Sequence, residues 1–224
     1  MIVCVGGIKG GSGKTTVATN LAIMRASDVS RVATSRHSDV LLIDADDQAT
    51  ATDFVQLRLA TEATWSCTCV QLSGRAVFSE TQKLRGKYAD IVIDTGGRDT
   101  SSQRGALAVA DLLLVPFVPR SFDVWTLEQV ASLVEEMRAA NPQLGAWSFL
   151  NRADARGQDN AQAAEVLRES KVIRFQELQL GQRKAFANAA AEGLAVCETQ
   201  DDDKACAEMQ ALYAKVFAKP ARKG

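Results

Sequence analysis

Short apolar runs alternate with longer amphipathic segments along the chain. The runs predict strands at Ile2–Val5, Val40–Ile43, Ile91–Ile93, Leu112–Val115 and Ala146–Leu150, with a weaker one at Thr64–Leu72. Continuous apolar runs are typical of parallel strands covered on both faces. Alternation of strands and helices is typical of βαβ units. We therefore expect an α/β fold with three layers, a doubly wound and mostly parallel sheet with helices on both faces.

Apolar positions at helical spacing mark the segments between the strands. They predict helices at Thr15–Arg25, Thr126–Ala140, Ala161–Ser170, Gly181–Glu192 and Asp202–Phe217. No internal repeat or low-complexity linker interrupts the pattern, so residues 1–224 are expected to form one domain. The polar stretch Ala26–Asp39 is predicted to be a loop, with Val32–Thr34 as a candidate short edge strand and His37 exposed to solvent.

Charge and cysteine content limit the possible functions. Lys and Arg number 26 and Asp and Glu 27, so a constitutive polyanion binder is not expected and any nucleic-acid surface must be a local patch. A single histidine argues against a His-based zinc site. The five cysteines lack a C-x-x-C pair and are expected to be reduced: Cys4, Cys67, Cys69, Cys197 and Cys206. Without a signal-peptide pattern or an apolar run of about 20 residues, the protein is expected to be soluble and cytoplasmic.

The stretch GGIKGGSGKTT, Gly6 to Thr16, follows the first predicted strand. Its glycines let several backbone N–H groups point at one phosphate, and the next helix directs its positive end at the same anion. Lys14 is predicted to reach the outer phosphates and Thr15 to supply a hydroxyl to Mg²⁺. The predicted nucleotide contacts are Gly10, Gly11, Ser12, Gly13, Lys14, Thr15 and Thr16.

Two further predicted strands end in carboxylates. The segment VLLIDAD ends in Asp44 and Asp46, and IVIDTGG carries Asp94. Ligands of open α/β sheets bind at the carboxyl ends of the strands. We therefore expect all three aspartates to converge on the phosphate loop, in a P-loop NTPase type of site for ATP and Mg²⁺.

These segments resemble the ParA/MinD family of deviant Walker A ATPases over nearly the whole chain. KGGSGKTT resembles the family's loop K-G-G-x-G-K-[ST]-[ST], DADDQATATDF its second motif, and IVIDTGG its Walker B strand. ADLLLVPFVPRSFDVWTLEQV, FLNRAD and GQRKAFANAAAEGLAVCE resemble later family segments. The resemblance is nearest to short plasmid-partition ParA proteins, which lack an N-terminal DNA-binding domain.

The resemblance implies an ATP-sandwich homodimer and a set of residue roles. Lys9 would reach the phosphates of the partner copy, and Asp46 would orient the attacking water. Mg²⁺ would be supported by Thr15, Asp44 and Asp94, directly or through water. Asn151 would contact adenine, with Arg152 beside it in the nucleotide-binding set.

The implied activity is slow, partner-stimulated, Mg²⁺-dependent ATP hydrolysis that drives plasmid partition or DNA segregation. The ATP-bound dimer would bind non-specific DNA on the nucleoid, and a ParB-type adaptor would stimulate hydrolysis and release. The candidate DNA contacts are Arg183 and Lys184, followed by Arg152, Arg156 and Arg174.

Two alternatives belong to other classes. A MinD-like ATPase would use the amphipathic segment Met209–Phe217 and the basic residues after it to bind a membrane, but the same apolar stripe suits a helix that docks on a sheet, and docking is favoured. A small-molecule kinase is disfavoured by Lys9 and the D-x-D-x-Q segment. Three features depart from the family pattern. Asp47 replaces the usual Pro and is interpreted as facing solvent, and the Ala26–Asp39 segment is longer than is usual before the second motif. Thr95-Gly96-Gly97 replaces a proline-containing run and is a candidate mobile sensor of the γ-phosphate.

Overall fold

The structure is a computed structural model. It describes residues 1–28, 39–61, 63–121, 124–156 and 158–218. The candidate edge strand Val32–Thr34 and His37 lie outside these residues. Within them, no helix is long and apolar enough to cross a membrane.

Seven parallel strands form a single sheet in the order β3-β2-β4-β1-β5-β6-β7. They are β1 Ile2–Val5, β2 Val40–Ala45, β3 Thr68–Gln71, β4 Asp90–Thr95, β5 Leu112–Phe117, β6 Gly145–Ala153 and β7 Arg174–Gly181. The strands β1, β2, β4 and β5 are buried along their whole length, as expected for strands covered on both faces.

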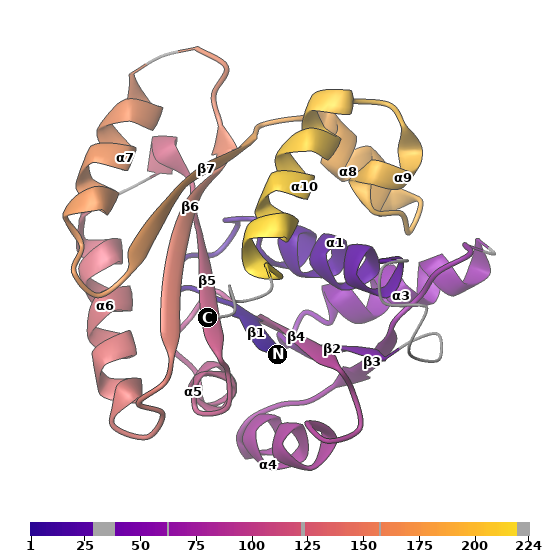
Figure 1. The fold of residues 1–224 in the computed structure, drawn as a ribbon, viewed down its shortest axis with the longest axis horizontal. Coiled ribbons are helices and arrows are strands. Elements are labelled where there is room, and N and C mark those ends of the chain that lie inside the picture. Colours follow the sequence, from indigo (N-terminus) through magenta and orange to yellow (C-terminus); the bar gives the residue numbers. More distant parts are fainter. Residues whose placement is uncertain (29–38, 62, 122–123, 157, 219–224) are drawn as a thin grey trace, which may run out of the picture.

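Helices cover both faces of the sheet (Figure 1), which confirms the predicted three-layer α/β fold. One face packs against α4 Arg75–Leu84, α5 Ser101–Leu107, α6 Val124–Arg138 and α7 Asp159–Glu169. The other packs against α1 Lys14–Ala26, α3 Thr50–Ala60, α8 Lys184–Ala191, α9 Val196–Thr199 and α10 Asp203–Val216. A short 3-10 turn, η1 Pro119–Ser121, precedes α6.

One strand, four helices and parts of two other elements differ from the sequence prediction. The helices α3, α4, α5 and α9 were not predicted, and β3 is shorter than the predicted strand Thr64–Leu72. β7 was not predicted, because its residues alternate between buried and exposed and several are polar, as suits the edge of a sheet. The helix predicted from Gly181 begins instead at Lys184, since β7 occupies the chain up to Gly181. The prediction for residues 181–183 was therefore wrong.

The apolar stripe of α10 docks on the sheet. Met209, Leu212 and Val216 are all at most 3% exposed and belong to the core shared with α1 and β1. The docking interpretation of this segment is confirmed.

Cys197 and Cys206 form a disulfide, with their Cα atoms 4.7 Å apart. The expectation that these two cysteines are reduced was therefore wrong. Their partnership depends on the packing of α9 against the start of α10, which residue spacing does not reveal. Cys4, Cys67 and Cys69 are free thiols, as expected.

A buried ion pair links α3 to the segment around α9. The Arg58 side chain is 0% exposed and donates two hydrogen bonds to the Glu198 carboxylate, at 2.8 and 2.7 Å. It also donates to the carbonyl oxygens of Trp65 and Gly193. Arg58 thus joins α3 to the loop that follows it and to the distant segment around α9.

We expect Arg58→Ala to lower the free energy of unfolding by about 3–5 kcal/mol, because it leaves Glu198 and two carbonyls without their buried donor. Urea unfolding measures the change. The matched control is Arg168→Ala, which removes the exposed pair with Glu177 and should change stability little. Equal destabilisation of both variants would contradict this account.

Candidate functional site

The loop between β1 and α1 offers backbone N–H groups to an anion. Gly11 and Gly13 have φ angles of 72° and 84°, in the left-handed region that glycine adopts readily. Gly13 is the N-cap of α1 and provides no side-chain hydrogen bond, so the first N–H groups of the helix keep their capacity to bind a ligand. This end of α1 is suited to a phosphate.

A cleft of about 900 Å³ opens beside this loop, at the carboxyl ends of the strands. Its lining includes the predicted contacts Gly10, Gly11, Gly13, Lys14, Thr15, Thr16, Asp46 and Arg152. The volume lies in the usual range for a small-molecule or cofactor site. The structure thus brings most of the predicted nucleotide-binding residues together around one cavity.

Lys14 is nearly buried, at 6% exposed, and its Nζ donates to the Lys9 carbonyl oxygen at 2.9 Å. Burial lowers the pKa of Lys14, while the nearby Asp94 and Asp46 favour its charged form. A cation in so little water interacts strongly with any anion that enters the cleft.

Asp94, at the end of β4, is 0% exposed, and neither of its carboxylate oxygens has a hydrogen-bond partner in the described part of the chain. Burial raises the pKa of Asp94 to about 7, and Asp44 and Asp46 add to the rise. The nearby Thr15 hydroxyl and the Lys14 ammonium group act in the opposite direction and lower the pKa of Asp94. The Thr15 hydroxyl is thus close to the carboxylate, but it makes no hydrogen bond to it. A buried carboxylate without partners is costly unless a cation compensates it.

The residues around Asp94 fit Mg²⁺ held together with a nucleotide. The described residues contain no cluster of three metal-binding side chains of the His, Cys, Asp or Glu type. Mg²⁺ needs no such cage, because it is usually held by one or two carboxylates with substrate phosphates and water. Asp94 and Thr15 would hold the ion, which when bound neutralises phosphate charge.

Asp44 is buried behind the cleft, and its hydrogen bonds are internal. Its Oδ2 accepts from the backbone N–H and the hydroxyl of Thr52, both at 2.8 Å, and its Oδ1 accepts from the Asp46 N–H at 3.2 Å. Asp44 therefore holds the turn that leads to α3. These contacts favour an indirect rather than a direct relation to Mg²⁺, and its metal role stays a prediction.

Asp46 is half-buried and borders the cleft, whereas Asp47 is exposed, as interpreted from the sequence. A Cβ added at Gly96 would lie 3.3 Å from Asp46 Oδ1, so this carboxylate reaches the segment that follows Asp94. The position is compatible with orienting a water at the phosphates. That role stays a prediction.

Gly97 lies so close to the phosphate loop that no side chain fits. A Cβ there would be 2.7 Å from both the N and Cα atoms of Gly10 and 3.0 Å from the Lys9 carbonyl carbon. The Thr95-Gly96-Gly97 sequence therefore has a physical reason: it lets two loops touch through their backbones.

Asn151, at the end of β6, donates from Nδ2 to the Ser12 carbonyl oxygen at 2.7 Å and is 6% exposed. It braces the phosphate loop, and its predicted contact with adenine stays a prediction. Arg152 is exposed at the cleft with a φ of 53°, next to an irregularity in the pairing of β6 with β7.

The far wall of the cleft comes from segments that motif reasoning missed. Ser73 and Gly74 follow β3, and the Gly74 N–H donates to the Ser102 hydroxyl at 2.8 Å. Arg98 and the start of α5 complete the wall. Short polar loops after strands are the only sequence signal for these residues, and that signal is weak.

Lys9, Arg183 and Lys184 are not among the residues that line the cleft, whereas the candidate DNA contact Arg152 is. Lys9 is half-buried and borders a separate small cavity near Phe117 and Val130. Arg183 is engaged: it donates to both Glu208 oxygens, at 3.1 and 2.6 Å, and pairs with Asp202 at 3.5 Å. Lys184 is exposed at the start of α8.

A protein-family model described as the CobQ/CobB/MinD/ParA nucleotide binding domain matches residues 3–196. The chain is 30% identical over 219 residues to maintenance of carboxysome distribution protein A of Gloeobacter kilaueensis, covering 96% of this chain and 91% of that protein. It is 24% identical over 202 residues to the protein of that name from Halothiobacillus neapolitanus, covering 87% and 85%.

A solved complex of Cyanothece McdA with ATP superimposes with a TM-score of 0.77, over 97% of this chain and 96% of that one. The two chains share 16% sequence identity. At that identity the likeness shows the fold alone.

We expect Asp94→Asn at pH 8 to raise the free energy of unfolding of the ligand-free protein by about 1–3 kcal/mol, because it removes a buried charge that has no partner. The same variant should lose the extra thermal stabilisation that Mg²⁺ adds to that of ATP. Asp47→Asn, an exposed acid of the same cleft, is the control and should retain it. Undiminished Mg²⁺ stabilisation in Asp94→Asn would contradict this site.

Proposed function

Because this chain belongs to the CobQ/CobB/MinD/ParA nucleotide-binding family, we propose that its ATPase cycle positions a cargo inside the cell. The chain is an ATP-binding ATPase of the ParA/MinD type, and positioning is what that type of ATPase does. The observation that carries the proposal is the arrangement of two lysines around one loop. Lys14 lines the cleft, whereas Lys9 borders a different cavity.

ATP drives formation of a sandwich homodimer in this proposal. Lys9 contacts the phosphates bound to the partner copy, and Lys14 contacts those in its own cleft. A second cation stabilises the charge that develops during phosphoryl transfer. The position of Lys9 away from its own cleft supports a role between copies.

Hydrolysis ends the dimeric state. Asp46 orients the attacking water, with Thr15 and Asp94 at Mg²⁺. The half-buried position of Asp46 at the cleft and its approach to Gly96 support this role. An adaptor of the ParB type, bound to the cargo, stimulates this step.

The ATP-bound dimer binds non-specific DNA, which would associate it with the nucleoid. Lys184 is the favoured contact, because it stands in the first turn of α8, where that turn carries no acidic residue. A cation there opposes the helix dipole and needs a compensating anion. Arg183 already has Glu208 and Asp202, so it holds the start of α8 in place.

The cargo is a protein assembly or a plasmid. Two sequence relatives are named for carboxysome distribution, which supports a protein assembly. Plasmid partition rests on the motif resemblance alone. The membrane-bound alternative is weakened, since the apolar stripe of α10 is buried in the core.

Lys9→Ala tests the dimer. We expect ATP to bind with near-normal affinity, because Lys14 and the loop backbone remain. ATP-dependent dimerisation should be abolished, and the hydrolysis rate should fall at least about tenfold, as for removal of a transition-state cation. Analytical ultracentrifugation with ATP and a phosphate-release assay measure both. Dimerisation equal to wild type would exclude the role between copies.

Lys184→Ala tests the DNA surface. Removal of one phosphate-binding lysine reduces the slope of log affinity against log salt by about 1, so a dimer that lacks two should show a slope about 2 smaller. Titration of a labelled duplex with ATP, with ADP and without nucleotide measures it. Lys204→Ala, an exposed lysine on α10, serves as the control. Identical slopes for the two variants would exclude Lys184 as a DNA contact. An absence of ATP-dependent binding by the wild-type protein would refute DNA binding altogether.

A further inference from the structure

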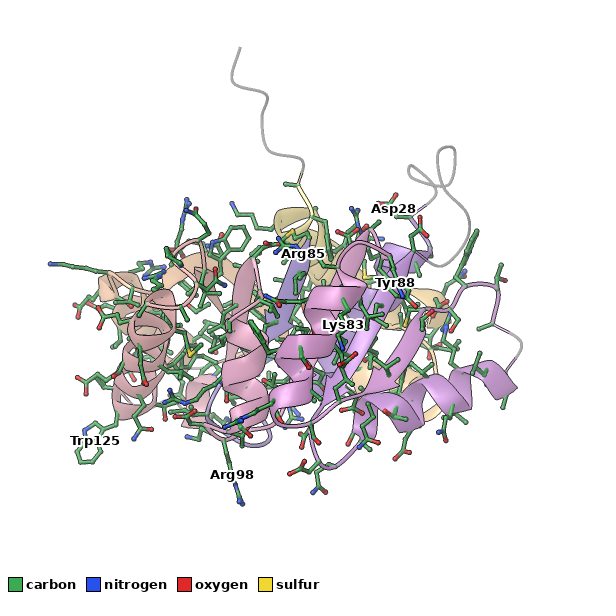
Figure 2. All side chains as sticks on the ribbon, turned by 90° about the horizontal axis from the view of Figure 1, so that it is seen from below. Asp28, Lys83, Arg85, Tyr88, Arg98 and Trp125 are labelled. Atoms are coloured by element: carbon green, nitrogen blue, oxygen red, sulfur yellow. A yellow bond between two sulfur atoms is a disulfide. The ribbon has the colours of Figure 1, made fainter. Side chains whose placement is uncertain are left out.

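Arg98 is an exposed arginine at the cleft, directly after the glycine pair that touches the phosphate loop. Figure 2 shows its side chain projecting from the same edge of the molecule as Trp125, whereas Arg85 lies at the opposite edge. Trp125 is in the first turn of α6, which follows β5 and the 3-10 turn η1, so this is the edge at which the strands end and the cleft opens. Arg98 therefore lines the same cleft as the phosphate loop, at the edge where the cleft opens.

The segment that carries Arg98 is held on both sides. Before it, Gly97 meets the backbone of Gly10. After it, the Thr100 hydroxyl accepts a hydrogen bond from the Gln103 N–H at 3.2 Å and caps α5. The position of the Arg98 backbone is thus set by the phosphate loop at one end and by α5 at the other.

The acidic neighbour of Arg98 is engaged with another cation. Both Asp99 oxygens accept from Arg104, at 2.8 and 2.7 Å, and Arg104 also binds Glu136 on α6. The Arg98 guanidinium has no hydrogen bond or ion pair within the described residues. The Asp99 carboxylate is therefore paired with Arg104 and not with Arg98. The charge of Arg98 is available to a ligand.

We propose that Arg98 contacts the terminal phosphate of a nucleoside triphosphate and makes the site distinguish ATP from ADP. A guanidinium presents several N–H donors in a planar fork that matches phosphate oxygens. Lys14 and the helix N-terminus bind phosphate from inside the cleft, whereas Arg98 binds it from the mouth. This contact extends the proposed function. It rests on the proposed homodimer only if Arg98 binds the nucleotide of a second copy.

Two sources of that phosphate fit the position of Arg98. One is the nucleotide in its own cleft, which Arg98 lines. The other is the nucleotide of a second copy, because the side chain projects outward at the edge where a sandwich dimer would meet (Figure 2). Both sources supply the same chemistry, and the experiment separates them.

The test compares Arg98→Ala and Arg98→Lys with Arg85→Ala, an exposed arginine at the opposite edge that pairs with Asp111. Fluorescent ATP and ADP analogues are titrated into each protein with Mg²⁺. We expect ATP affinity to fall about tenfold or more in Arg98→Ala, as for removal of a charge-assisted hydrogen bond, and ADP affinity to change less than about twofold. Arg98→Lys should fall between, since it keeps the charge without the fork.

An equal fall of ATP and ADP affinity in Arg98→Ala would overturn the proposal, because it would indicate a displaced loop instead of a missing bond to the terminal phosphate. Affinities matching those of Arg85→Ala would overturn it as well. Wild type that binds ATP more tightly than ADP but stays monomeric would refute the dimer of the proposed function and leave the Arg98 contact in its own cleft intact.

Mixing identifies the source of the phosphate. Copies with Lys14→Ala lack productive ATP binding but retain Arg98, so they can supply it to Arg98→Ala copies. A rise in ATP hydrolysis on mixing supports contact with the nucleotide of the second copy. Hydrolysis equal to the sum of the separate proteins supports contact within the same cleft.

Discussion

A buried carboxylate with no partner among the described residues lies at the centre of this protein's site. Asp94 is held at the end of a fully buried strand, in surroundings that raise its pKa to about 7, chiefly through burial. Lys14 experiences the opposite effect nearby, because burial lowers its pKa. The fold tolerates both groups because the neighbouring parallel strands and α1 hold them in place. A metal–nucleotide complex bound here would bring a cation to Asp94 and phosphate to Lys14, and so would compensate the cost of burying both charges.

The parallel sheet makes this arrangement possible. All strands point the same way, so β1, β2 and β4 deliver the phosphate loop, Asp44 and Asp94 to one edge. In register, Asp94 lies beside Asp44 on one side and Val5 on the other, which fixes their proximity through backbone hydrogen bonds. Asp44 and Asn151 then support the site from behind through Thr52 and Ser12. Binding residues at the cleft thus rest on buried residues whose own hydrogen bonds are internal.

The contacts between loops connect the site to its surroundings. Gly97 touches the phosphate loop, and two residues later Asp99 is tied through Arg104 to α6. The phosphate loop is therefore in contact with a segment that is continuous with α5 and tied to α6. Fold and family establish nucleotide binding and hydrolysis, whereas the cargo depends on surfaces that vary among proteins of one fold.

Features that depend on local pattern could be predicted from the sequence. Apolar runs predicted the central strands, glycine spacing predicted the phosphate loop, and aspartates at strand ends predicted the acidic side of the cleft, because each is encoded within a short stretch of chain. Contacts between distant segments could not be predicted in this way. Examples are the pairing of Arg183 with Glu208, the amide of Asn151 on Ser12, the disulfide between Cys197 and Cys206, and the half-polar edge strand β7. Such contacts arise only when the sheet has assembled, since a side chain's partner depends on which strands and helices become its neighbours.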